Sequence, residues 1–178
     1  MPQDLAAVLF DRDGTLIEDV PYNGDPALVR PLPGVRTALG RLRAVGVRTG
    51  LVSNQSGVAR GLITVSDVLA VHRRLTELVG PFDVQRFCPH AEDAGCPCRK
   101  PAPGMIHSAL TELAVSPARA AMVGDIGADV EAGRAAGVRT VLVPTARTRA
   151  VEVYAAPAVA ADFATAVDGL IANAFDVG

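Results

Sequence analysis

The segment from Val8 to Leu16, V-L-F-D-R-D-G-T-L, constrains the fold more than any other part of this chain. A short apolar run, typical of a buried strand, leads directly into two carboxylates, a glycine and a hydroxyl. Open α/β sheets bind their ligands at the carboxyl ends of the strands. We therefore expect Asp11 and Asp13 to project into a crevice, where two close carboxylates repel each other unless a cation neutralises them or one holds a proton. A bare D-x-D also occurs in turns with two solvated aspartates.

Composition limits the class of protein. The length of 178 residues suits one domain, residues 1–178, and a hydrophobic fraction of 49% with mean hydropathy +0.29 indicates a globular chain. The net charge of -2 and pI near 5.9 argue against a nucleic-acid partner. No apolar stretch approaches the roughly 18 residues that cross a bilayer, and no basic segment precedes the first apolar run. We expect a soluble cytoplasmic monomer that contacts neither membrane nor nucleic acid.

Strand and helix patterns alternate along the chain, which predicts a doubly wound three-layer α/β/α sandwich with a mainly parallel sheet. The predicted strands run from Ala6 to Phe10, Val47 to Ser53, Val84 to Phe87, Ala120 to Val123 and Thr140 to Val143. The predicted helices run from Gly34 to Ala44, Ser66 to Val79, Pro103 to Leu113, Ala128 to Ala136 and Asp162 to Ala174. Pro103 suits a first helical turn, and Gly46 and Gly137 suit helix C-termini. The segment from Val151 to Ala161 is less clear, and a helix broken at Pro157 is one interpretation.

The gaps between these elements are too short for a separate cap domain. We therefore expect an open site whose specificity is set by three loops, which run from Ile17 to Arg30, from Asn54 to Gly61 and from Cys88 to Pro101.

Three further segments place polar groups beside the predicted strands. The second strand ends at Ser53, whose hydroxyl and the backbone N–H groups that follow suit a phosphoryl oxygen, although polar residues after a strand often only form a turn. Lys100 is the only lysine in an arginine-rich chain, so its position favours a compact ammonium group over a planar guanidinium. The pattern G-D-x-x-x-D places Asp125 at a strand tip and Asp129 at the start of the next helix, where an N-cap is the alternative interpretation.

Carboxylates and carbonyls are the ligands that Mg2+ prefers. We expect Asp11, Asp125 and the backbone carbonyl of Asp13 to bind it, with Asp129 behind them orienting a water or Lys100.

All three cysteines lie in one loop, C-P-H-A-E-D-A-G-C-P-C. An odd number does not suit a disulfide framework, and three thiolates with one imidazole match a structural Zn2+ site. The predicted ligands are Cys88, His90, Cys96 and Cys98. His72 and His107 fall in helical patterns and are assigned no chemical role.

These motifs together resemble the haloacid dehalogenase (HAD) superfamily of phosphohydrolases. The match covers D-x-D-G-T-L, the serine at the end of the second strand, R-K-P and the second acidic pair. C-P-H, five residues, C-x-C-R-K-P, with S-N-Q-S-G-x-A-R-G upstream, resembles a zinc-loop subgroup that contains heptose 1,7-bisphosphate and histidinol-phosphate phosphatases. In close heptose-type relatives the position of Ile126 often holds lysine, and the short zinc loop is similar to that of the histidinol-type proteins.

The resemblance implies a Mg2+-dependent phosphomonoesterase that acts on a small phosphorylated metabolite through an aspartyl-phosphate. Asp11 would be the nucleophile, Asp13 the acid and base, and Ser53 and Lys100 would stabilise the phosphoryl group. Further substrate contacts are expected from Asn54, Gln55, Arg60 and Arg99. The C7 phosphate of heptose 1,7-bisphosphate is the expected target, with histidinol phosphate or another small metabolite as the alternative.

Two other classes also fit parts of the sequence. A receiver-like signalling domain is doubly wound and is phosphorylated on aspartate, but it needs neither Asp13 nor a zinc loop. A zinc-stabilised nucleic-acid-binding module would need a basic stripe with aromatic residues, which this acidic chain does not have.

Overall fold

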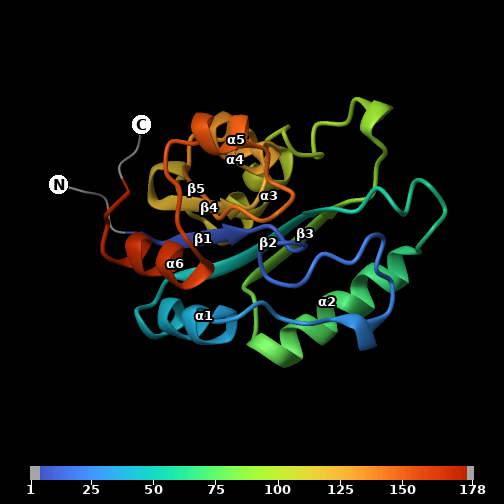
Figure 1. Ribbon diagram of the computed structural model, residues 1–178, viewed down its shortest axis with the longest axis horizontal. Coiled ribbons are helices and arrows are strands. Elements are labelled where there is room, and N and C mark those ends of the chain that lie inside the picture. The colour runs from blue at the N-terminus through green and yellow to red at the C-terminus, as the bar shows by residue number, and fades with distance from the viewer. Residues whose placement is uncertain (1–4, 176–178) are drawn as a thin grey trace.

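The computed structural model describes residues 5–175, so both ends of the predicted domain 1–178 lie outside the described residues. Its centre is a parallel sheet of five strands in the order β3-β2-β1-β4-β5 (Figure 1). The strands are β1 (Ala7–Phe10), β2 (Arg48–Asn54), β3 (Val84–Cys88), β4 (Ala120–Gly124) and β5 (Arg139–Leu142). All five predicted strands are confirmed, with ends that differ by one residue.

Helices cover both faces of the sheet, which confirms the predicted three-layer sandwich. On one face lie α1 (Val35–Ala44), α2 (Val65–Val79) and α6 (Phe163–Ile171). On the other lie α3 (Gly104–Leu113) and α4 (Gly127–Ala135), with the short α5 (Ala150–Ala155) beyond α4 in Figure 1. Short 3-10 turns occupy Pro26–Leu28, Glu92–Ala94 and Pro117–Arg119.

The central strand β1 is buried on both faces because its side chains alternate between two hydrophobic clusters. Val8 and Phe10 pack with α1, α2 and α6, whereas Ala7 and Leu9 pack with α3 and α4. All four residues are fully buried. A continuous apolar run is therefore what this position requires, since a polar side chain on either face would lose its hydration.

Three predicted helix features need correction. Pro103 is the N-cap of α3 and precedes its first turn; the backbone N–H of Gly104 donates to the carbonyl of Pro97. The last helix ends at Ile171, and Asn173 just beyond it has a left-handed φ of 55°. In the segment from Val151 to Ala161, a helix is present as α5 and ends before Pro157, but the part beyond it is extended: Val159 pairs with Leu142, and this covers the outer edge of β5.

Within residues 5–175, the helices and strands are connected by loops and by the short 3-10 turns named above. No helix in this range is long and apolar enough to cross a membrane.

Candidate active site

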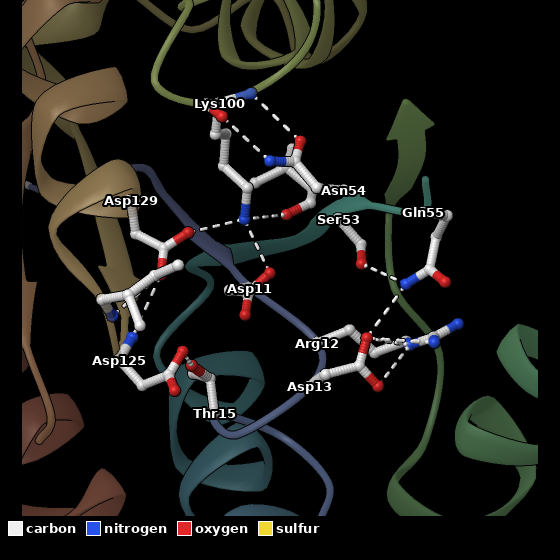
Figure 2. A network of polar contacts seen from close by, with 12 residues as sticks. Asp11, Arg12, Asp13, Thr15, Ser53, Asn54, Gln55, Lys100, Asp125 and Asp129 are labelled. Carbon is white, nitrogen blue, oxygen red and sulfur yellow. Dashed lines mark hydrogen bonds and ion pairs between the residues drawn. The ribbon is translucent and has the colours of Figure 1, made fainter. Parts of the chain in front are cut away.

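The strand order brings distant parts of the chain to one edge of the sheet. After β1 the chain adds β2 and β3 on one side and then returns to add β4 and β5 on the other, so β1 and β4 flank a topological switch point. Ligands bind at such points, beyond the carboxyl ends of the strands. Figure 2 shows that Asp11 after β1, Ser53 on β2, Lys100 before α3 and Asp125 after β4 meet there.

Lys100 holds two aspartates together. Its Nζ lies 2.6 Å from Asp11 Oδ1, 2.6 Å from Asp129 Oδ1 and 2.9 Å from the carbonyl oxygen of Val52. Burial acts to lower the pKa of Lys100, but the carboxylates of Asp11 and Asp129 raise it above its ordinary value. The ammonium group therefore stays charged, and its three donors are all used.

Three buried carboxylates form an acidic cluster beside this ammonium. One oxygen from each of Asp11, Asp125 and Asp129 lies within 4.8 Å of the others. Burial raises the pKa of Asp11, and Lys100 opposes that rise. Burial and the neighbouring Asp129 raise the pKa of Asp125 to about 7. One cation does not balance three carboxylates, so the cluster suits an additional hard cation.

Asp129 is the member of this cluster whose two oxygens are already occupied. Oδ1 accepts from Lys100, and Oδ2 accepts from the backbone N–H groups of Asp125 and Ile126 at 3.1 and 3.2 Å. A side chain at Gly124 would place its Cβ 2.2 Å from the Cβ of Asp129. Glycine at this position therefore lets Asp129 reach the strand tip, where it orients Lys100 and the Asp125 backbone.

Asp125 stays more accessible. Among the described residues, the donors to its two carboxylate oxygens are the hydroxyls of Thr15 and Thr145, each at 3.5 Å. Gly14 allows this arrangement, because it has a φ of +82° and a Cβ there would lie 2.4 Å from Asp125 Oδ2. The glycine after the D-x-D thus serves both the turn and the approach of the second acidic motif.

Asp13 points away from Asp11, as Figure 2 shows, and has its own partners. Arg12 Nη2 lies 3.0 Å from Asp13 Oδ2, and Gln55 Nε2 donates to the same oxygen at 2.9 Å. Gln55 Nε2 also lies 2.8 Å from Ser53 Oγ. Gln55 therefore links the D-x-D turn to the end of β2.

Asn54 is bound to the backbone of Lys100. Its Nδ2 donates to the Lys100 carbonyl at 2.9 Å, and its Oδ1 accepts from the Lys100 N–H at 3.0 Å. Both functional atoms of this amide are thus engaged, and they fix the segment that carries the lysine. Substrate binding by Asn54 stays a prediction, and any such contact would have to use the remaining N–H and lone pair.

The predicted zinc ligands also converge. Donor atoms of Cys88, His90, Cys96 and Cys98 all lie within 4.8 Å of one another. The sulfur atoms are 3.1 to 3.6 Å apart, and His90 Nδ1 lies 3.4 and 3.3 Å from the sulfurs of Cys88 and Cys98. A tetrahedral site with Zn–S bonds of about 2.3 Å separates sulfurs by about 3.8 Å. The four donors are therefore close to the arrangement that a tetrahedral ion requires.

Known proteins are similar to this chain in sequence and in fold. A family model described as HAD-hydrolase-like matches residues 97–169. The D-glycero-beta-D-manno-heptose-1,7-bisphosphate 7-phosphatase of Rhodopseudomonas palustris is 37% identical over 143 residues, 74% of this chain and 79% of that protein. The protein of that name from Pseudomonas putida is 34% identical over 149 residues, 79% of this chain and 83% of the relative.

A solved structure of the corresponding phosphatase from Bordetella bronchiseptica, complexed with magnesium and phosphate, superposes with a TM-score of 0.84. It is 31% identical, and the match covers 95% of this chain and 99% of that one. This chain belongs to the heptose-bisphosphate phosphatase family of HAD hydrolases. It is a phosphatase with an α/β fold of the HAD type.

The phosphatase site opens into a cavity of about 340 Å³. Of the three predicted specificity loops, the first contributes residues 19–22, the second residues 54–57, and the zinc loop only Lys100. Ile126 also lines the cavity, and Arg147 does so from the segment after β5. The prediction of three loops therefore missed a fourth segment.

Three predicted phosphate or substrate ligands lie outside this lining: the buried Ser53, Arg60 and Arg99. Arg60 stacks over the ring of Tyr22, with 5.6 Å from its Cζ to the ring centroid, and Tyr22 is the residue that reaches the cavity. Arg99 pairs with Glu92 at 3.2 Å and lines a neighbouring depression of the phosphatase surface. Their binding of substrate stays a prediction.

Two arginines that the sequence did not single out line the cavity instead, Arg12 and Arg147. Arg12 lies in the middle of the D-x-D motif, and this position was the sequence signal that could have identified it as a cavity residue. Nothing distinguished Arg147 from the other arginines of the phosphatase sequence.

Proposed function

We propose that this phosphatase hydrolyses the C7 phosphate of D-glycero-D-manno-heptose 1,7-bisphosphate through an aspartyl-phosphate intermediate. The observation that carries the proposal is the buried Lys100, which joins Asp11 to Asp129 beside Asp125 at the edge of the cavity. The relatives that act on this substrate match most of the chain, which supports the choice of sugar.

Asp11 is the nucleophile in this proposal. Lys100 occupies its Oδ1, and no described residue donates a hydrogen bond to Oδ2, so Oδ2 is the oxygen placed to attack phosphorus. As the O–P bond to Asp11 forms, the bond to the sugar oxygen breaks, and Asp13 gives that oxygen a proton. Asp13 then removes a proton from a water, which attacks phosphorus and releases inorganic phosphate and free Asp11. Lys100 and Ser53 stabilise the charge on the phosphoryl oxygens.

Mg2+ fits the acidic cluster. Asp11, Asp125 and the backbone carbonyl of Asp13 are the proposed ligands, whereas both oxygens of Asp129 are engaged. When bound, the ion would neutralise charge on the transferring phosphoryl group.

Zn2+ fits the donors of Cys88, His90, Cys96 and Cys98, which offer a closed set without an open coordination position. Its proposed role is structural. Cys88 ends β3, and the loop that contains the other three ligands leads directly into Arg99 and Lys100. Zinc would thus fix the segment that positions the catalytic lysine.

Variants of the two D-x-D aspartates test the chemistry. Asp11→Asn should abolish turnover, whereas Asp13→Asn should form a phosphoryl-enzyme that decays slowly and accumulates in rapid-quench experiments with labelled substrate. More than about a hundredth of wild-type activity in Asp11→Asn corresponds to a barrier increase below roughly 3 kcal/mol. That result would exclude covalent catalysis at Asp11.

Substrate choice is tested by kcat/KM for the heptose bisphosphate and for histidinol phosphate. Histidinol phosphate carries an ammonium and an imidazole, so its pocket needs carboxylates or aromatic faces beyond the catalytic groups. Asp19 and Tyr22 offer such groups in this cavity, but Arg147 pairs with Asp19, and Arg60 covers the ring of Tyr22. We expect a preference for the bisphosphate; a preference for histidinol phosphate would reverse the substrate proposal and leave the phosphatase chemistry standing.

The metals are tested by elemental analysis and by Cys96→Ala. About one zinc per chain should survive dialysis, and activity should still require added Mg2+. Cys96→Ala should lower stability and activity together, because loss of the ion releases the loop before Lys100. Full activity in a zinc-free preparation would contradict the structural role.

A further inference from the structure

Arg147 and Asp19 form an ion pair at the catalytic cavity. Arg147 Nη1 contacts Asp19 Oδ2, and the two residues are 128 positions apart in sequence. Both line the same cavity as Asp11 and Lys100. The side chain of Arg147 is 59% exposed and that of Asp19 is 26% exposed, so the guanidinium can change partner without leaving a buried position.

The turn that carries Arg147 is tied to the catalytic strand β4. Thr148 Oγ1 donates to the backbone carbonyl of Asp125 at 2.5 Å, and Thr145 Oγ1 lies 3.5 Å from Asp125 Oδ2. Within the turn, the N–H of Thr145 donates to Thr148 Oγ1 at 2.8 Å, and the N–H of Arg147 donates to Thr145 Oγ1 at 3.2 Å. Arg147 is therefore held at a defined place relative to Asp125, although its side chain is exposed.

The other cations of the cavity already have catalytic partners. Among the described residues, the cationic side chains that line it are Arg12, Lys100 and Arg147. Arg12 pairs with Asp13, and Lys100 pairs with Asp11 and Asp129. Only the Arg147 pair involves no member of the proposed catalytic set.

We propose that Arg147 is a specificity-determining residue that binds the phosphate of the substrate that does not react. The inference rests on the proposed function, since it requires a sugar that carries two phosphates. A bisphosphate that places one phosphate at Asp11 needs a second cation beyond the reacting centre, and Arg147 is the cation of this cavity that remains for it. The planar guanidinium binds phosphate through two parallel hydrogen bonds.

Binding exchanges one partner of Arg147 for another. In the free enzyme Asp19 neutralises the guanidinium, and an exposed pair of this kind contributes little stability. A phosphate dianion carries more charge than a carboxylate and is the stronger partner. Asp19 thus competes with ligands for the guanidinium of Arg147: a weakly charged ligand does not displace it, whereas a phosphate does.

The test compares KM and kcat for the 1,7-bisphosphate and for the 7-monophosphate of the same heptose. Arg147→Ala should raise KM for the bisphosphate by about 10- to 100-fold, the loss of a charge-assisted hydrogen-bonded pair. Its KM for the monophosphate should change by less than about 3-fold, and kcat should change little for both. Arg147→Lys, which keeps the charge without the fork, should lie in between. Arg134→Ala removes an exposed arginine on α4 that lies outside the cavity lining, and it controls for net charge.

Asp19→Asn provides a second measurement. It removes the competing carboxylate, so KM for the bisphosphate should fall or stay unchanged, and a rise equal to that of Arg147→Ala would overturn the exchange. Equal effects of Arg147→Ala on the two substrates would overturn the assignment of Arg147. The wild-type rate on the bisphosphate tests the proposed function separately: an inactive wild type overturns both ideas, whereas an active one with a substrate-independent Arg147 effect overturns only this inference.

Discussion

Replacement of Lys100 by methionine would test whether this side chain holds the acidic cluster together. The change keeps much of the aliphatic volume and removes the ammonium. It leaves three acceptors without their donor: Asp11 Oδ1, Asp129 Oδ1 and the carbonyl of Val52, which lie 2.6, 2.6 and 2.9 Å from Nζ. Only 2% of the lysine side chain is exposed, so water does not replace the lost contacts.

The expected loss is large. Breaking a buried ion pair by removing one partner costs about 3 to 5 kcal/mol, because the other charge stays buried without compensation. Two carboxylates lose their partner here, so we expect the upper part of that range. A domain of this size has a free energy of unfolding of about 5 to 15 kcal/mol, and Lys100→Met should therefore be folded but much less stable.

Urea unfolding at pH 7.5 without added Mg2+ measures this loss. The matched control is Arg74→Met, which removes one cation from an exposed pair with Glu77 and should cost about 0.5 kcal/mol or less. Asp129→Asn should itself destabilise the protein, but in the Lys100→Met background it removes an unpaired carboxylate. The double variant should then be more stable than the sum of the single losses by at least about 1 kcal/mol. A loss below about 1 kcal/mol for Lys100→Met, or strict additivity, would refute the reasoning.

Two other substitutions address polar groups whose roles the structure clarifies. Asn54→Ala removes both hydrogen bonds to the Lys100 backbone, so kcat should fall about 10- to 100-fold with KM little changed; a rise in KM alone would show that Asn54 instead binds substrate. Burial, together with Arg12, lowers the pKa of His72 to about 3, whereas unfolded histidine titrates near 6.5. The unfolded chain therefore binds a proton that the folded one does not between these values, and stability falls as pH decreases, by at most about 1.4 kcal/mol per pH unit. His72→Gln should remove this part of the slope in urea titrations from pH 7 to 5, and an unchanged slope would contradict it.

The sequence by itself determined the fold class and the groups that meet at the sheet edge. The apolar run before Asp11 predicted a buried strand, and the alternation of strand and helix patterns predicted a parallel sheet between helices. These predictions succeed because each depends on a short segment of sequence. The carboxyl ends of parallel strands lie at the same edge of the sheet, so the polar residues at these ends lie near one another. The clustering of Cys88, His90, Cys96 and Cys98 is also local, since the four ligands fall within one loop.

Only the tertiary structure decided which partner each polar side chain takes. Asn54 lies in a segment that the sequence assigned to substrate binding, yet its amide is bound to Lys100, 46 residues away. Arg147 lines the cavity, and its ion-pair partner there is Asp19, 128 residues away in the sequence. The sequence pattern indicates the helix, strand or loop on which a residue lies. It does not indicate the partner of a long polar side chain, because an arginine or asparagine pairs with the neighbour that the packed elements bring within about 3 Å, and this packing depends on contacts distant in sequence.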